Sequence, residues 1–502
     1  MERKIPNVMG TQHPDNAFKP FFKHREPFIP AGREVDEAFE NFSTLGADEY
    51  MWDWEGKHAD SSVIDRLYTR HYDYFKENPL GRDKFLTFRL PNIWEEKGYS
   101  LMQAMTTMLV AEDFAHDLGF EQRPLFEAIL PMCQSADQLF EMEEKFAKLA
   151  HFKDDEFSQG YKNIDSLQMI PLFESFEAQL NAPEVLKNFV ELYQKHFKRE
   201  LPYVRVFLAG SDSALSNGFI NSIIGNKLAL TKLAEFSAES GLPVYPIAGT
   251  GSTIFRGGLS PYTVDRYLEE FPGLKTATIQ SAFRYDFPLE EVVKPAIKKL
   301  KAGLQKNDFK PISSEDQDVL YDIAQQTAAE YHDTLDPLIV DMQPVFKAFP
   351  KRRDRRQHIG LIGYSRDVDG FDLPRAITFT GALYSMGVPP EVIGTGRVLK
   401  KLTPDQFKTL EKHYPNIRAD FAQVLKFYSP AAMEVLLAAN PAWKAVQDDV
   451  KALEELFNLQ AGPSNADEER HAELAADLNR IGDTETRALL IERMAKLRRF
   501  LG

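Results

Sequence analysis

Short apolar runs alternate with longer amphipathic stretches through most of the chain. Seven runs have the length and apolar character of buried strands: residues 84–90, 125–131, 168–173, 203–208, 244–248, 277–280 and 358–362. Stretches with helical spacing, such as residues 183–195 and 288–306, lie between most of them. Strands that alternate with helices predict parallel βαβ units.

Seven strand–helix units, with an eighth strand not located, predict a (β/α)8 TIM-type barrel, an α/β fold, with additional helices. The alternative is an open, doubly wound sheet. The chain has neither a G-x-G-x-x-G turn after its first predicted strand nor a Walker-type lysine loop, which disfavours that alternative. We therefore expect one large domain over residues 1–502. An N-terminal cap reaches about residue 80 and carries a histidine loop, a barrel follows over about 81–400, and a helix-rich part covers about 400–502.

Composition places the chain among ordinary globular proteins, with 43% hydrophobic and 27% charged residues in 502. Its one cysteine, Cys133, excludes an intramolecular disulfide and favours a cytoplasmic location. Cys133 lies in an apolar stretch, so we expect a buried thiol more than a nucleophile.

The formal net charge of −15 disfavours nucleic acid as a partner, although local arginines can still bind an anionic substrate. No apolar run approaches the 18 or so residues of a membrane span, and no apolar segment of a signal peptide follows the first residues. We therefore expect neither a nucleic-acid nor a membrane partner.

Polar residues follow several of the predicted strands directly. Glu174 follows the run 168–173, Asp212 follows 203–208, and Arg284 follows 277–280. A β/α barrel builds its active site at the carboxyl ends of its strands, so these side chains should face one cavity.

Glu174 and Asp212 are one strand–helix unit apart, which places them at the ends of adjacent strands. Two carboxylates, completed by water and substrate oxygens, suit Mg²⁺, with Mn²⁺ as a second possibility. Taken singly, Glu174 would be a solvated loop acid and Asp212 a helix N-cap. As a pair at matching strand ends they favour a metal site.

A glycine-rich loop at residues 249–258, GTGSTIFRGG, follows the run 244–248. Glycines let backbone N–H groups approach phosphate oxygens, and an arginine supplies a permanent cation for phosphate or carboxylate. The loop is also a candidate lid, although glycine-rich turns without an anion are common. Its candidate substrate-contacting residues are Thr250, Gly251, Ser252, Arg256 and Gly257.

Three further residues are candidates for the chemistry. His13, in the rigid turn TQHPDN, can act as an acid or base near neutral pH, although a lone histidine is more often structural. Arg89 ends the strand-like run 84–90, and Arg375 follows DLP at 372–374. Both arginines can clamp an anion or form scaffold ion pairs.

Together these motifs resemble phosphoenolpyruvate carboxylase of the short archaeal type, over His13 to about Gly396. The carrying segments are GTQHPDN at 10–16, GADEYMWDWEGKH at 46–58, LTFR at 86–89, PLFE at 171–174, SDSA at 211–214, STIFRGG at 252–258 and LPRAI at 373–377. The resemblance implies that His13, Arg89 and Arg256 are catalytic and that Glu174 and Asp212 bind the metal. It also implies a homotetramer, a dimer of dimers.

The resemblance further implies the reaction. Bicarbonate attacks the phosphorus of phosphoenolpyruvate, His13 takes the proton of carboxyphosphate, and the enolate captures CO₂ to give oxaloacetate. Two positions depart from the longer enzymes of the family, which have a lysine at Leu215 and an arginine at Thr250. Residues that could replace them are Arg205, Lys227, Arg284 and Arg366. The rival interpretations are another Mg²⁺-dependent enolate-forming lyase or mutase, and a barrel that binds phosphorylated metabolites without catalysis.

Overall fold

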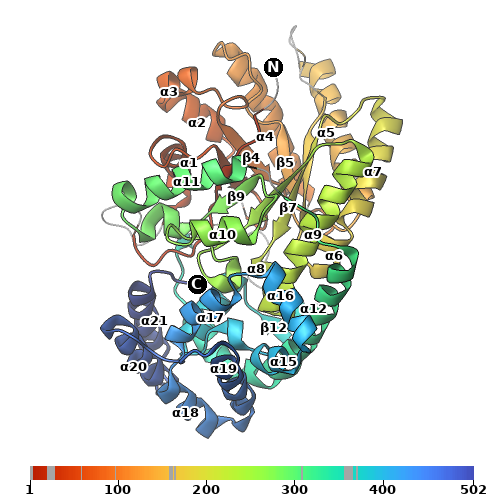
Figure 1. Cartoon of the computed structure of the whole chain (residues 1–502). Coiled ribbons are helices and arrows are strands. Elements are labelled where there is room, and N and C mark those ends of the chain that lie inside the picture. Colours follow the sequence, from red (N-terminus) through yellow and green to blue (C-terminus); the bar gives the residue numbers. More distant parts are fainter. Residues whose placement is uncertain are drawn as a thin grey trace.

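A closed barrel of eight parallel strands forms the centre of the molecule in the computed structural model (Figure 1). The structure describes residues 4–19, 29–57, 59–95, 98–157, 162, 165–306, 309–354, 366–368 and 371–502. The barrel strands are β1 (Val8–Gly10), β3 (Glu49–Asp53), β4 (Phe85–Arg89), β5 (Glu127–Leu130), β6 (Gln168–Phe173), β7 (Val204–Ala209), β8 (Val244–Gly249) and β9 (Thr276–Ile279). The predicted fold class is therefore confirmed.

Closure is made by β1, which pairs with β3 on one side and with β9 on the other. Six of the seven predicted strands are β4 to β9. The seventh, residues 358–362, lies outside the described residues. The predicted start of the barrel near residue 81 was wrong, because β1 and β3 precede it, and β9 ends the barrel far before residue 400. That the whole chain is one domain stays a prediction.

Side chains inside the barrel form three layers, as the two-residue period of a strand requires. On β3 the alternation runs from Glu49 at the base through Met51 in the middle to Asp53 at the mouth. The interior between these acids is an apolar cluster, with two successive inward positions on β6 and on β7, and consists of Met9, Met51, Ile129, Ile170, Leu172, Phe207, Ala209 and Ile247. The two ends of the barrel carry polar groups, and this apolar interior separates them.

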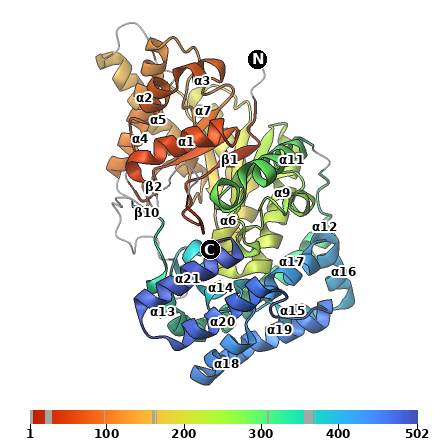
Figure 2. The same ribbon diagram turned by 90° about the vertical axis from the view of Figure 1, so that its left-hand side faces the viewer.

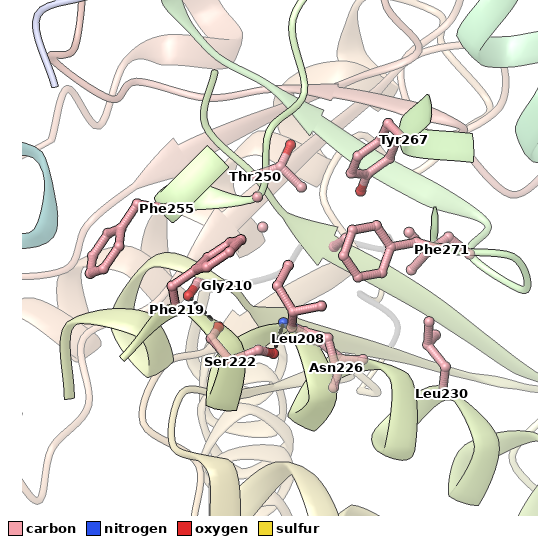
Figure 3. Close-up of a pocket in the computed structure, with 15 residues that line it drawn as sticks. Leu208, Gly210, Phe219, Ser222, Asn226, Leu230, Thr250, Phe255, Tyr267 and Phe271 are labelled. Carbon is pink, nitrogen blue, oxygen red and sulfur yellow. Dashed lines mark hydrogen bonds between the residues drawn. The ribbon is translucent and has the colours of Figure 1, made fainter. Parts of the chain in front are cut away.

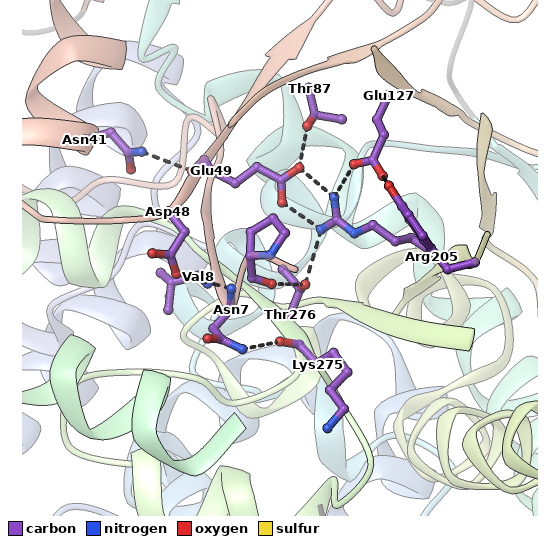
Figure 4. Close-up of polar contacts among 12 residues, drawn as sticks. Asn7, Val8, Asn41, Asp48, Glu49, Thr87, Glu127, Arg205, Lys275 and Thr276 are labelled. Atoms are coloured by element: carbon purple, nitrogen blue, oxygen red, sulfur yellow. Dashed lines mark hydrogen bonds and ion pairs between the residues drawn. The ribbon is translucent and has the colours of Figure 1, made fainter. Parts of the chain in front are cut away.

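The base of the barrel is filled by Arg205 of β7 and the groups that bind it (Figure 4). Its guanidinium donates to Glu49 at 2.7 and 2.8 Å, to Glu127 at 2.8 Å and to the Thr276 hydroxyl at 3.2 Å. The Thr87 hydroxyl also donates to Glu49. Both terminal nitrogens of Arg205 are therefore bound by acceptors at the end of the barrel opposite to the mouth.

Helices surround the barrel. Those between its strands and directly after it are α1 (Glu34–Ser43), α2 (Val63–Arg70), α3 (Tyr72–Glu77), α4 (Gly98–Asp117), α5 (Ala136–Phe157), α6 (Phe176–Leu180), α7 (Ala182–Phe197), α8 (Ser211–Asn217), α9 (Phe219–Ser240), α10 (Val264–Glu270) and α11 (Lys294–Gln305). A π-helical turn, Ala282–Asp286, follows β9.

The remaining helices form a second layer across the carboxyl end of the barrel, seen below it in Figures 1 and 2. They are α12 (Ser314–Leu335), α13 (Ile339–Ala348), α14 (Ala376–Ser385), α15 (Gly396–Lys401), α16 (Pro404–His413), α17 (Ile417–Val424), α18 (Pro430–Ala439), α19 (Lys444–Phe457), α20 (Ala466–Arg480) and α21 (Thr484–Arg498). Two small sheets pair β2 (Ile29–Pro30) with β10 (Arg353–Asp354) and β11 (Arg366–Val368) with β12 (Phe371–Leu373).

The last residues of the chain return to the junction between the barrel and this helical layer, as both ribbon views show (Figures 1 and 2). The Leu501 N–H donates to the Asp15 carbonyl at 3.0 Å, which joins this end to the loop after β1. Among the helices of the described residues, none has the length and apolar character needed to span a membrane.

Candidate active site

The loops that follow the barrel strands bring the predicted residues to one end of the barrel. His13 follows β1, Arg89 ends β4, Glu174 follows β6, Asp212 lies in the first turn of α8 after β7, and Arg256 lies in the loop after β8. The carboxyl ends of parallel strands all open at the same rim, so strand direction alone collects these side chains.

His13 is held by contacts on both its ring and its backbone. Its Nδ1 lies 2.8 Å from the Thr11 hydroxyl, and its carbonyl accepts a hydrogen bond from Arg284 at 3.1 Å. Burial, and then the charges of Arg256 and Arg89, hold the pKa of His13 well below its usual value, against the opposing charge of Asp53. The imidazole is therefore neutral at physiological pH and able to accept a proton.

Arg89 is clamped by acidic residues of the segment around β3. Its guanidinium donates to Asp53 at 2.8 and 2.9 Å, and it forms an ion pair with Glu55 at 2.7 Å. Burial alone would lower the pKa of Arg89, yet Asp53 and Glu55 raise it well above the usual value, and Glu174 adds to this effect. Lys57 also pairs with Asp53. These acids belong to the block at residues 46–58, to which the sequence alone assigned no roles.

Arg256 lies buried between the loop after β1 and the end of the chain. Its guanidinium contacts Asp15 at 3.3 Å and donates to Gln280 and to the Gly502 carbonyl, each at 2.5 Å. Burial lowers the pKa of Arg256, while Asp15 and, more weakly, Asp212 oppose this change. The sequence pointed to Arg256 but gave no sign of Asp15 as its partner.

The glycine-rich loop is a packed turn. Its backbone N–H groups at 251 and 256–259 donate to carbonyls of the same loop at 2.5–3.0 Å. A side chain at Gly251 would meet the Arg256 guanidinium, whose Cζ lies 2.8 Å from the added Cβ, so only glycine fits there. The loop therefore uses much of its backbone to hold Arg256, which does not support the phosphate cradle and the lid expected from its composition.

The Thr250 hydroxyl, a predicted substrate contact, is also used internally. It donates to the Thr278 carbonyl at 3.0 Å, and the Thr250 N–H donates to the Thr278 hydroxyl at 2.8 Å. Gly257 has a φ of +103° and packs against Thr250, where an added Cβ would lie 3.0 Å from the threonine Cβ. These contacts tie the loop to β9. Ser252, the other hydroxyl of the prediction, is buried in the same turn.

Glu174 and Asp212 end neighbouring strand–loop units. β6 and β7 are paired with Leu172 opposite Phe207 and Phe173 opposite Leu208, so the next residues of both strands reach the same rim. Glu174 is buried and Asp212 is half-buried. The charge of Glu174 acts on Arg89 and that of Asp212 on Arg256. This pair of hard oxygen donors suits a divalent cation that keeps some water or substrate ligands.

Gln12 Nε2 is a buried donor at the mouth with no hydrogen-bond partner among the described residues. The Gln12 side-chain oxygen accepts from the Asp53 N–H at 3.1 Å, which orients its amide. Buried donors are normally satisfied, so the unpartnered Gln12 amide, directly before His13, favours an anionic ligand. Gln12 was missed, although it directly precedes His13 in the motif.

The other predicted residues have different surroundings. Arg284 is buried in an ion pair with Glu37 at 2.5 Å and supports the His13 carbonyl. Arg375 is exposed at the start of α14, and its substrate contact stays a prediction. Of the candidates to replace the family residues missing at Leu215 and Thr250, Arg205 lies at the barrel base, Lys227 pairs with Glu270 outside the barrel, and Arg284 holds the His13 loop.

The Arg366 side chain, the remaining candidate for that replacement, lies outside the described residues. Cys133 is buried as expected, and burial raises the pKa of its thiol to about 12, which excludes a thiolate nucleophile near neutral pH.

A small cavity lies outside the barrel wall, beneath the glycine-rich loop (Figure 3). It is lined by Leu208 of β7, Phe219 and Leu230 of α9, Tyr267 of α10 and Phe271. Its volume of about 20 Å³ admits one water molecule, which would satisfy the buried Tyr267 hydroxyl. The cavity is therefore a packing feature, separate from the mouth of the barrel.

Comparison with known proteins bears on this site. A family model described as phosphoenolpyruvate carboxylase matches residues 5–502. The chain is 63% identical to a phosphoenolpyruvate carboxylase of Oenococcus oeni, over 100% of this chain and 99% of the relative. It is 57% identical to that of Leuconostoc mesenteroides over 100% and 99% of the two chains. It is 38% identical to that of Pyrococcus abyssi over 85% and 89%.

Proposed function

The chain belongs to the phosphoenolpyruvate carboxylase family, in its short archaeal type, and we propose how the residues at the barrel mouth carry the reaction. The enzyme adds bicarbonate to phosphoenolpyruvate and yields oxaloacetate and phosphate. The reaction must neutralise a phosphate and two carboxylates, move one proton and protect an enolate from water. The mouth offers groups suited to the first two tasks, and the helical layer across it suits the third.

Glu174 and Asp212 are the residues to which we assign the divalent cation, Mg²⁺ or Mn²⁺. Carboxylates are the protein ligands that Mg²⁺ prefers, and one or two are enough when substrate oxygens complete the set. Among the described residues no group of three or more metal-ligating side chains is present, so oxygens of water or substrate would fill the other positions. When bound, the cation supplies Lewis-acid stabilisation of the enolate oxygen.

His13 is the base in this proposal. Bicarbonate attacks the phosphorus of phosphoenolpyruvate, which breaks the bond to the enol oxygen and gives carboxyphosphate and the enolate. With Nδ1 bonded to Thr11, Nε2 takes the carboxyphosphate proton. The intermediate then splits into CO₂ and phosphate, and the enolate carbon attacks CO₂. The lowered pKa of His13 supports this role, because the ring is neutral when the proton arrives.

Arg256, Arg89 and Gln12 are the groups that we assign to the anions. Arg256 pairs with one side-chain carboxylate, Asp15, at 3.3 Å, and its Nε has no hydrogen-bond partner among the described residues. Arg89 is fixed by Asp53 and Glu55 and keeps its planar guanidinium in one orientation. Fixed cations in a buried site stabilise charge that develops in the transition state, because they need no reorganisation. Arg284 acts indirectly by holding the His13 loop.

The observation that carries the proposal is that five residues from five different strand ends lie at one rim of the barrel. Glu174 acts on Arg89, Arg89 and Arg256 act on His13, and Asp212 acts on Arg256. The first test is oxaloacetate production from phosphoenolpyruvate and Mg²⁺, coupled to malate dehydrogenase and NADH, with and without bicarbonate. We expect bicarbonate-dependent NADH loss that matches phosphate release. Turnover without bicarbonate would instead support another enolate-forming enzyme.

The role of His13 is tested by His13→Asn, which removes the base but keeps a polar side chain. We expect oxaloacetate formation to fall by about 10²- to 10⁴-fold, the usual contribution of a general base. Binding of Mn²⁺, followed by electron paramagnetic resonance, should survive. His413→Asn is the control, because His413 pairs with Asp316 in the helical part, far along the chain from the site. Full activity of His13→Asn would exclude this role.

The homotetramer and the cytoplasmic location implied by the family resemblance are also part of this proposal. Light scattering coupled to gel filtration would measure the mass of the assembly against the chain mass of 57.3 kDa. A mass of one or two chains would contradict the tetramer.

A further inference from the structure

The backbone next to Arg256 is tied to the helical layer by a buried carboxylate. The Phe255 N–H donates to Oε1 of Glu391 at 2.8 Å. Glu391 lies in the 3₁₀ turn Pro390–Val392 and has no exposed surface. The contact therefore joins the glycine-rich loop, at the residue directly before Arg256, to a segment far along the chain.

The surroundings of Glu391 are unusual for an acid. The Tyr384 hydroxyl of α14 donates to the same Oε1 at 2.9 Å, and Oε2 is buried without a hydrogen-bond partner among the described residues. Burial raises the pKa of Glu391 to about 7, and the charge of Asp420 on α17 acts in the same direction. Burying a carboxyl in this way disfavours folding, so a role in mere space filling does not explain it.

A displacement of the backbone at Phe255 would move the whole glycine-rich loop. Residues 251 and 256 and residues 253 and 258 are joined by backbone hydrogen bonds of 2.5 and 2.8 Å, so the loop holds together as one unit. Near the start of the loop, the Thr250 hydroxyl donates to the Thr278 carbonyl of β9. Glu391 fixes the backbone at Phe255, and the centroid of the Phe255 ring lies 5.7 Å from that of Phe379. Loss of the contact with Glu391 would release the loop at the residue directly before Arg256.

We propose that Glu391 is a positioning residue for Arg256: by holding the Phe255 N–H, it fixes the loop so that the guanidinium faces the substrate. The contacts of Arg256 with Asp15 and Gln280 depend on this placement. Glu391 does not touch the reacting atoms and acts only through the loop. The inference rests on the anion-binding role proposed above for Arg256.

The test compares Glu391→Ala, Glu391→Gln and Glu391→Asp. Glutamine keeps an oxygen that can accept the Phe255 N–H, whereas alanine removes it and aspartate withdraws it by one methylene while keeping the charge. We expect alanine and aspartate to lower kcat/KM for phosphoenolpyruvate at least 10-fold, with a raised KM, and glutamine to remain within about 3-fold of the parent. Aspartate also covers the case in which the alanine variant does not fold.

Glu143→Ala is the matched control. Glu143 is also a buried acid that accepts two backbone N–H groups, those of Leu167 and Met169, each at 3.2 Å, but it lies on α5. We expect it to lower the melting temperature without a specific rise in KM. Equal kinetic effects of Glu143→Ala and Glu391→Ala at equal loss of stability would overturn the inference, as would full activity of Glu391→Asp.

Arg256→Gln separates the role proposed for Arg256 from the role proposed for Glu391. Full activity of Arg256→Gln would refute the proposed role of Arg256 itself. Loss of activity in Arg256→Gln, with both Glu391→Ala and Glu391→Asp unaffected, would refute only the positioning role. If Glu391 acts through Arg256, the double variant of Arg256→Gln and Glu391→Ala should be no worse than Arg256→Gln alone within about 3-fold. Multiplicative losses would overturn the inference.

Discussion

An arginine lies buried at each end of the barrel, and the two have opposite electrostatic surroundings. Arg205 at the base meets two carboxylates, Glu49 and Glu127, at 2.7–2.8 Å. Arg256 at the mouth meets one side-chain carboxylate, Asp15, at 3.3 Å, together with oxygens of Gln280 and Gly502. Burial alone would lower both pKa values. It does so for Arg256, whereas the pKa of Arg205 is raised by its two partners.

The difference shows what a buried cation does at each position. At the base the protein itself supplies the counter-charge, and the cluster closes the barrel (Figure 4). At the mouth Arg256 meets one side-chain carboxylate, which suits the anion-binding role proposed for it. The apolar interior keeps the two polar ends apart. The same residue type is therefore structural at the base and, in the proposal, binds substrate anions at the mouth.

The sharpest test of this contrast is Arg256→Gln. Because the mouth arginine is expected to stabilise the transition state, kcat/KM for phosphoenolpyruvate should fall by about 10³-fold. The melting temperature should fall less than in the reciprocal change at the base, since Arg256 pairs with one buried side-chain carboxylate and Arg205 with two. Steady-state kinetics and calorimetry measure the two effects. A large loss of stability with unchanged kinetics would reverse the assignment of the two ends.

The reciprocal change at the base is Arg205→Met. It leaves Glu49 and Glu127 buried without their cation, and breaking a buried ion pair in this way typically costs about 3–5 kcal/mol. The folded fraction should keep nearly normal kcat/KM. Denaturant unfolding followed by circular dichroism gives the stability. A selective loss of kcat in a stable Arg205→Met variant would contradict a purely structural base.

The pH dependence of stability should also differ between the two ends of the barrel. Glu143, which caps the backbone before and within β6 near the base, has a pKa raised by burial to about 8. The unfolded chain releases this proton near pH 4.5, so stability should fall as pH rises from about 4.5 to 8. Glu143→Gln should remove roughly 2 kcal/mol or more of that fall. Parallel stability–pH curves for the two proteins would disprove this. At the mouth the sign is opposite, because the lowered pKa of His13 makes its contribution to stability fall as pH falls below the usual histidine value.

The smallest effect is expected from Thr250→Val. Thr250 lies at the mouth, where the longer enzymes of the family resemblance have an arginine, but its hydroxyl bonds the Thr278 carbonyl. Loss of that bond should cost about 1 kcal/mol of stability and change kcat/KM less than 3-fold. A fall in kcat/KM above 10-fold would show that the hydroxyl contacts substrate. Thr250 would then be a substrate-binding residue, in contrast to the structural role expected here.

The hydrophobic pattern predicted six barrel strands correctly, because β4 to β9 are apolar runs of four or more residues. It missed β1 and β3 for physical reasons. β1 has only three residues, too few for a period to appear. β3 carries an acid at each end because both ends of the barrel interior are polar, so its sequence EYMWD does not resemble a buried strand. The misplaced start of the barrel follows from these two omissions.

The candidate residues were found because a parallel barrel puts every strand end at one rim, which sequence order alone implies. Their supporting partners were not found. Asp15 is 241 residues from Arg256, and Glu391 is 136 residues from Phe255, and no local pattern records such distant pairs. The glycine-rich loop shows the same limit, since its composition suggested a phosphate cradle but its backbone bonds are used within the loop.

The sequence by itself determined the fold class, the family and the residues of the mouth that carry charge and basicity, because strand period, strand direction and motif order are properties of the chain. Only the tertiary structure decided which carboxylates pair with each buried arginine, and how the helical layer contacts the glycine-rich loop. The reason is that burial and counter-charge come from residues far apart in sequence, and their distances exist only once the chain has closed into its barrel.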